Sequence, residues 1–207
     1  GGHVESQLAY SLNGWHFQRG LRENFIVQGA PGDVDFGCVY PCCMVDTEDG
    51  LLIYAAVSKR EHGHAHNSCG AVAAYRLRPD GFVSLCSKNG YGSLKTKALY
   101  LGEDGLTFNV RCPNGSFRIG ALTPEGAQIP GYSLTECVAF QGDSLKMEPV
   151  WQSGKSLKQL AGQAVVLEIE LLEAELFSYT GKFIPMTPYQ TFDFLTFHTV
   201  PQERPGF

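Results

Sequence analysis

Three histidines occupy alternate positions in one short segment, as His62, His64 and His66. If that segment is an extended strand, alternate side chains point to the same face, and the three imidazoles would face one way. Three imidazoles with an open fourth position form a plausible zinc site, to which Glu61 could add a carboxylate. The alternative is a solvated polar loop that is rich in histidine by chance. A divalent metal is thus one candidate cofactor, and the simpler expectation is that there is none.

A second group of residues has the chemistry of carbohydrate binding. Sugar sites combine an exposed aromatic ring, which stacks on the apolar face of a sugar, with carboxylates or amides that bind its hydroxyls. Trp151 and Asp143 are the best such pair, and Glu136 and Tyr132 are near them in sequence. The alternative is that Trp151 fills the core and Asp143 closes a turn after Gly142, because large aromatics are mostly buried and Asp is common in turns.

The charge of the chain argues against two classes of partner. Its 207 residues include 16 Lys and Arg and 21 Asp and Glu, which gives a net charge of -5. Binding to nucleic acid or to an anionic membrane needs clustered Lys and Arg, and the sequence has no such cluster. No apolar run reaches the roughly 20 residues that cross a bilayer. We therefore expect a soluble chain that binds neither nucleic acid nor membrane.

Seven cysteines are spread through the chain without any paired CxxC spacing. Disulfide and zinc frameworks favour an even, spaced set, so the odd count predicts mainly buried, small apolar side chains in a reducing compartment. This usage favours a cytoplasmic protein. The start GGHVES leaves open whether the natural protein extends upstream of Gly1, so the sequence does not fix its localisation.

Period-two alternation recurs along the chain, and helical periodicity is almost absent, which predicts an all-β protein. Residues 8–12 alternate before Asn13-Gly14, a favoured hairpin turn, and Trp15 and Phe17 would begin the returning strand. Further strands are expected at 51–57 and at 69–78, the latter before the turn Pro79-Asp80-Gly81. We predict an antiparallel, propeller-like meander over residues 1–68.

Longer strands with one apolar face are expected from residue 69 to about residue 180. The inward positions form three groups: Leu106, Phe108 and Val110; Phe117, Ile119 and Ala121 after the turn Pro113-Asn114-Gly115; and Leu167, Ile169 and Leu171. One dry and one wet face are typical of a β-sandwich. Residues 156–162 give the one helical signal, of about one turn. Residues 181–207 form an aromatic-rich tail that we expect to pack back on the body.

Several strings occur in an order that resembles a known family. They are LAYSLNGWHFQR at 8–19, AYRLRPDGFVSL at 74–85, LKTKALYLGEDGLTFNV at 94–110, IPGYS at 129–133 and AELFSY at 174–179. Together they resemble the last propeller hairpin and the C-terminal sandwich of glycoside hydrolase family thirty-two-like proteins. The resemblance covers most of residues 6–180 and implies a concanavalin-A-like jelly roll that follows the last part of a five-bladed propeller.

The chain departs from this family in its catalytic motifs. Retaining hydrolysis of a glycoside needs two carboxylates that flank one bond. The resemblance implies an aspartate nucleophile, a second aspartate in an RDP motif and a glutamate in an EC motif, all on the first propeller blades. This sequence has no RDP, and its Glu136-Cys137 lies after IPGYS in the sandwich region, so we do not transfer the acid/base role to Glu136. We expect no hydrolysis by the chain alone.

These observations predict a non-catalytic, C-terminal accessory β-sandwich portion of a glycoside-hydrolase-like protein. The resemblance implies that it supports an upstream propeller domain or forms a homo-oligomer, and that it binds a carbohydrate of the fructan, arabinan or xylan class. Two alternatives stay open. One is a small metal-dependent enzyme built on the three histidines, and the other is a structural interaction domain without a ligand, which would present a broad apolar patch.

Overall fold

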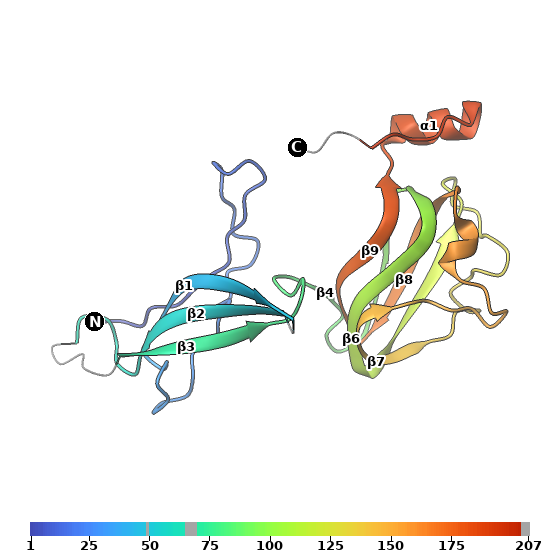
Figure 1. The fold of residues 1–207 in the computed structure, drawn as a ribbon. Helices are drawn as coiled ribbons and strands as arrows, with labels where there is room; N and C mark the ends of the chain where they lie inside the picture. Colours follow the sequence, from blue (N-terminus) through green and yellow to red (C-terminus); the bar gives the residue numbers. More distant parts are fainter. Residues whose placement is uncertain (49, 65–69, 204–207) are drawn as a thin grey trace. The chain divides into compact units, whose positions relative to one another are not determined.

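A computed structural model describes residues 1–48, 50–64 and 70–203 of the chain (Figure 1). The chain divides into two compact units, Gly1–Phe82 and Val83–Phe207, each with a sheet of its own. Strands account for most of the regular structure, together with one α-helix and one 3₁₀ turn in the described part. The prediction of an all-β protein is therefore confirmed.

The sheet of the first unit contains β1 (Cys38–Thr47), β2 (Gly50–Ser58) and β3 (Gly70–Leu77), which pair antiparallel in that order (Figure 1). The predicted strands at 51–57 and 69–78 correspond to β2 and β3. Alternate side chains of β2 face a small core, which comprises Ile26, Val39, Ile53, Ala55 and Val57.

The division between the units falls after Phe82, whereas the sequence placed it after residue 68. The physical reason is strand pairing. Residues 70–77 form the third strand of the first sheet, in register with β2 from Ser58↔Gly70 to Leu51↔Leu77. The turn at Pro79-Asp80 then ends this sheet, where the Gly81 amide donates to the Arg78 carbonyl at 2.8 Å.

The segment predicted as a strong hairpin near residue 13 forms only one pair of backbone hydrogen bonds, between Tyr10 and Gln18 at 2.8 and 2.9 Å. The Asn13 side chain instead accepts hydrogen bonds from the backbone amides of Trp15, at 3.0 Å, and His16, at 2.9 Å. This local turn competes with a strand ladder. The segment is therefore a loop whose apolar side chains are exposed.

The second unit contains eight elements, of which β6 is the longest and lies at the centre of the sheet (Figure 1). The strand order is β4-β9-β6-β8-β5, and β7 also pairs with β6. The elements are β4 (Leu85–Cys86), β5 (Tyr91–Lys95), β6 (Leu99–Leu122), β7 (Phe140–Met147), η1 (Leu157–Leu160), β8 (Ala164–Leu172), β9 (Glu175–Pro185) and α1 (Pro188–Phe197).

The inward positions predicted for this unit are all buried. They belong to one large core that also contains Trp151, Leu157 and Leu160. The predicted turn at Pro113-Asn114-Gly115 lies within β6, where the pairing with β7 shifts register between Cys112 and Phe117. Asn109 alternates with these inward positions in the sequence and is buried as well, at a point where the pairing of β6 with both β7 and β9 shifts register.

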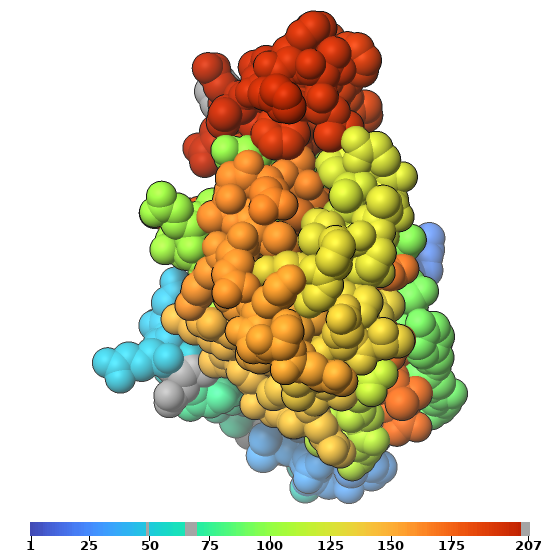
Figure 2. Space-filling view, turned by 90° about the vertical axis from the view of Figure 1, so that its right-hand side faces the viewer, coloured from blue at the N-terminus to red at the C-terminus, as the bar shows by residue number. Residues whose placement is uncertain are grey.

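The long segment between β6 and β8 covers one face of the second unit, shown in yellow and orange in Figure 2. The predicted single helical turn at 156–162 is present as η1. Residues 181–185 continue β9, and α1 follows with a capping box in which the Thr187 and Gln190 side chains each bond the other residue's backbone amide. The ring centres of Phe194 and Tyr100 lie 5.6 Å apart, so the helix contacts the body of the unit.

Candidate functional site

A cleft lies in the second unit where β4, β6 and β9 meet, and we call it the Arg111 cleft. Its volume is about 530 Å³, within the range typical of small-molecule sites. The residues that line it are Cys86, Ser87, Lys88, Asn89, Arg111, Pro113, Glu173, Ala174 and Glu175. Each belongs to the second unit, so its own fold forms the cleft.

One wall of the cleft is held by backbone hydrogen bonds between two segments far apart in sequence. The Ser87 amide donates to the Ala174 carbonyl at 3.0 Å, and the Ala174 amide donates to the Ser87 hydroxyl at 3.3 Å. The Glu173 amide donates to the Gly90 carbonyl at 3.2 Å. These bonds fix the wall before any ligand arrives, which lowers the entropic cost of binding.

Arg111 and Glu175 form the charged centre of the cleft. Arg111 Nε donates to Glu175 Oε2 at 2.7 Å, and Nη2 donates to the same oxygen. The two residues are cross-strand neighbours on β6 and β9, and the Arg111 guanidinium lies 5.9 Å from the centre of the Phe177 ring. Pairing and ring contact hold both charged groups in defined positions.

The two predicted sugar residues Tyr132 and Trp151 are brought together, but inside the core. Their rings meet edge to face at 4.9 Å, and Trp151 Nε1 donates to the Ser133 carbonyl at 3.1 Å. Only 1% of Trp151 and 4% of Tyr132 are exposed. Trp151 thus presents no face to a sugar, and its assignment as a stacking platform is wrong. The burial of large aromatics, the alternative interpretation, explains its position.

Glu136 lies beside this buried pair without the properties of a general acid. Its carboxylate accepts hydrogen bonds from the Ser133 hydroxyl at 2.6 Å and the Ser133 amide at 3.2 Å. These bonds lower the pKa of Glu136, whereas a general acid needs a raised one. The adjacent Cys137 is buried, and burial raises the pKa of its thiol.

Asp143 lies away from that group, on β7, where it pairs across the sheet with Arg111. Arg111 therefore has Asp143 on one neighbouring strand and Glu175 on the other. No signal in the sequence indicated these two partners of Arg111. They depend on the register of β6 with β7 and β9, and two bulges set that register.

The predicted metal site falls partly outside the described residues, because His66 belongs to the segment 65–69. His64 Nδ1 lies 3.2 Å from Arg60 Nη1, a cationic neighbour that disfavours a metal there. Within the described ranges, no group of three or more His, Cys, Asp or Glu side chains is placed to hold a metal ion. Metal binding at His62, His64 and His66 stays a prediction.

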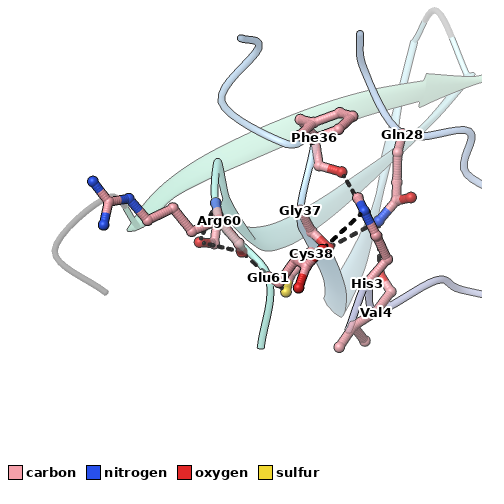
Figure 3. Close-up of polar contacts among 9 residues, drawn as sticks. His3, Val4, Gln28, Phe36, Gly37, Cys38, Arg60 and Glu61 are labelled. Carbon is pink, nitrogen blue, oxygen red and sulfur yellow. Dashed lines mark hydrogen bonds and ion pairs between the residues drawn. The ribbon is translucent and has the colours of Figure 1, made fainter. Parts of the chain in front are cut away.

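The chain's first residues lie beside Phe36 and Glu61 (Figure 3). The His62 amide donates to the Gly2 carbonyl at 2.9 Å, and His3 Nε2 lies 3.6 Å from Glu61 Oε1. His3 Nδ1 also lies 3.0 Å from the Phe36 carbonyl. Glu61, which could have added a carboxylate to a metal, is thus next to an imidazole from another segment.

Gln28 and Cys38 strengthen the same region (Figure 3). The Gln28 side chain donates to the Val4 and Gly37 carbonyls at 3.1 and 3.2 Å, and the Cys38 thiol donates to the Arg60 carbonyl at 3.4 Å. These contacts tie the N-terminal segment to β1 and to the end of β2. The region around His62 is thus a structural junction.

Six of the seven cysteines are described, and each is a free thiol. Cys38, Cys112 and Cys137 are buried, so the prediction that most cysteines are buried holds for only half of the described ones. The exposed ones are Cys42, Cys43 and Cys86, and Cys86 lines the Arg111 cleft. The pairing of β1 with β2 shifts register at a bulge between Pro41 and Cys43. The adjacent Cys42 and Cys43 therefore do not follow the regular alternation of strand faces.

Comparison with known proteins gave no match to any family model, curated protein or solved structure at the significance required. The strands and their pairing show an all-β protein with a sandwich-like second unit. In the described part, no helix has the length and apolar character that crossing a bilayer requires.

Proposed function

We propose that this chain is a non-catalytic accessory portion of a glycoside-hydrolase-like protein. In this proposal the first unit is a propeller-blade-like element, and the second is a jelly-roll sandwich. The first unit packs against a further β-sheet of the parent protein, an upstream propeller. The sequence resemblance supports the family, and one feature of the first unit supports the docking.

That feature is an exposed apolar face on the sheet β1-β2-β3, opposite the small core. We call it the Tyr40 face. Pairing places its side chains in three rows, which are Tyr40, Ala56 and Val72; Cys43, Tyr54 and Ala74; and Val45, Leu52 and Arg76. Eight of these nine side chains carry no charge at neutral pH.

The exposure of this face is large for a protein surface. Val72 is 77% exposed, Val45 45% and Tyr40 38%. A sheet with two apolar faces normally has a layer packed on each. Large exposed apolar patches usually mark interaction sites. A further sheet is therefore the partner that suits this face.

Cysteine labelling tests this docking. Cys43 lies on the Tyr40 face, and Cys86 is an exposed control in the second unit. Both thiols would be labelled with a maleimide in the chain itself and in the whole product of its gene, and the peptides quantified by mass spectrometry. We expect Cys43 to react at least about tenfold more slowly in the whole product, with Cys86 unchanged. Equal rates for Cys43 in both proteins would contradict the docking.

A further inference from the structure

The outer edge of β3 carries an inference about a partner that goes beyond the accessory role. We propose that β3 pairs antiparallel with β3 of a second copy of this chain, so that two three-stranded sheets form one continuous sheet around a two-fold axis. The inference concerns the edge of this sheet and not its Tyr40 face, so it stands whether or not that face docks on another sheet.

β3 is an edge strand of the first sheet (Figure 1). It pairs with β2 on one side, without a register shift, from Ser58↔Gly70 to Leu51↔Leu77. Within residues 1–48, 50–64 and 70–203, neither a strand nor an isolated bridge pairs with the other side of β3. An edge strand presents a row of backbone N–H and C=O groups, and the partner that suits such a row is another extended strand.

The opposite edge of the same sheet, formed by β1, has features that oppose pairing. The N-terminal segment covers the start of β1, where the Val4 amide donates to the Gly37 carbonyl at 3.1 Å and the Val39 amide donates to the Val4 carbonyl at 3.0 Å. Further along β1, Pro41 has no N–H to donate, and a bulge follows it. Covering segments, prolines and bulges protect edge strands from pairing with other chains.

In the described part of the chain, β3 has none of these protective features. Its sequence, GAVAAYRL, contains no proline and a single charged residue, Arg76. A regular, mainly apolar edge of this kind is a site where another strand can pair. The contrast between the two edges also limits the assembly. Pairing through β3 leaves only the protected β1 edges outside, so the assembly closes at two copies.

The side chains of β3 suit pairing with a copy of the same strand. A two-fold axis perpendicular to the sheet keeps each face continuous, so the core-facing row of one copy meets the core-facing row of the other. That row contains Ala73, Tyr75 and Leu77, which are partly buried and pack against the small core of the first unit. Pairing therefore joins the borders of two small cores and removes more apolar surface from water.

The charge of β3 permits this pairing. Two registers keep the faces continuous and pair all but one residue of β3, and they are centred on Ala73 or on Ala74. In the first register Arg76 faces Gly70 of the second copy, and in the other it faces Val72 of the second copy. Neither register places like charges of β3 opposite each other, which would be destabilising.

Sedimentation equilibrium of the full chain tests the proposal. At about 100 µM, well above a micromolar dissociation constant, we expect a mass twice the 22.6 kDa of the chain. The mass should fall to that of one chain on dilution. A chain that stays monomeric at this concentration, or that forms assemblies larger than two copies, would overturn the proposal.

Two matched pairs of lysines separate edge pairing from stacking of two Tyr40 faces. Val72→Lys with Ala74→Lys places like charges directly opposite each other in either register, and should weaken dimerisation at least about tenfold. The control is Tyr40→Lys with Val45→Lys, which adds the same charge to the same face at the β1 edge. We expect the control to dimerise like the unmodified chain. Equal weakening by both pairs would place the contact on the Tyr40 face and overturn edge pairing.

Amide hydrogen exchange in the unmodified chain gives a second test, which does not depend on the folding of any variant. Amides of β3 that donate to the second copy are protected only in the dimer. We expect exchange within residues 70–77 to slow at least about threefold between about 1 and 100 µM protein, with exchange within residues 38–47 unchanged. Exchange within residues 70–77 that does not depend on concentration would overturn the assignment of β3 as the contact.

Discussion

At the scale of single residues, Trp151 was expected to stack on a sugar, but its side chain lies in the core of the second unit. The ring is fully enclosed, touches Tyr132 and donates its N–H to the Ser133 carbonyl. Its function is to fill the core of the second unit.

Replacing Trp151 should destabilise the second unit strongly. Trp151→Ala is expected to lower the free energy of unfolding by about 3–5 kcal/mol, because it leaves a large cavity. Urea unfolding followed by far-UV circular dichroism would measure the change. Trp15→Ala is the matched control, since Trp15 is 86% exposed. Similar, small effects of both replacements would show that Trp151 is not a core residue.

Glu173 has φ 45°, in the left-handed region, and offers a test of backbone strain. Glu173→Gly should raise the free energy of unfolding by about 1 kcal/mol, because glycine adopts a positive φ without steric cost. Thermal unfolding would measure the gain. Glu173→Ala removes the same carboxylate but keeps the strain, so it should not be stabilising. Equal gains from the two variants would attribute the effect to the charge.

The hydrogen bonds from Ser133 to Glu136 predict a pH dependence. They lower the pKa of Glu136 in the folded state, so their contribution to stability is complete above the unfolded-state pKa. It is lost as pH falls through the lowered, folded-state pKa. Ser133→Ala should raise the Glu136 pKa toward its ordinary value, which carboxyl NMR titration would detect. An unshifted titration would show that Ser133 does not control this carboxylate.

At the scale of elements, the sequence predicted the positions of the strands better than it predicted which residues pair across them. β2 and β3, and the buried positions of β6 and β8, follow from period-two alternation. The sequence predicted a stronger hairpin near residue 13 than the structure has. The Asn13 side chain accepts hydrogen bonds from backbone amides that would otherwise be available for strand pairing. The pairing of Arg111 with Glu175 could not be predicted, since it depends on bulges that alternation does not reveal.

Helix α1 was missed because its ten residues are rich in aromatics and none of them is buried. Its start was nevertheless encoded: Thr187, Pro188 and Gln190 form a capping box with proline in the first turn. Thr187→Ala should destabilise the helix by about 1 kcal/mol. Amide hydrogen exchange within 188–197 would rise, whereas the exposed control Thr196→Ala should change little. Equal exchange in both variants would show that the cap is unimportant.

At the scale of the whole molecule, the two units have unequal cores. Among the described residues, the large core lies within the second unit, and the core of the first unit contains five buried apolar residues. A difference of this size makes the first unit the less stable one by itself. Its exposed Tyr40 face and its small core are consistent with a unit that needs a neighbour.

The units should therefore unfold in two steps. In urea, the first unit is expected to unfold at the lower concentration, while Trp151 fluorescence reports the second transition. A fragment of residues 83–207 should keep the second transition unchanged. A single coincident transition in the chain, together with an unfolded fragment, would show that the two units are one cooperative structure.

We propose that this chain is a non-catalytic part of a glycoside-hydrolase-like protein. The most direct measurement is release of reducing sugar from fructan, arabinan and xylan by the chain and by the whole product of its gene. We predict no release by the chain and release from one substrate by the whole product. Hydrolysis by the chain alone, or a whole product without glycosidase activity, would contradict the account.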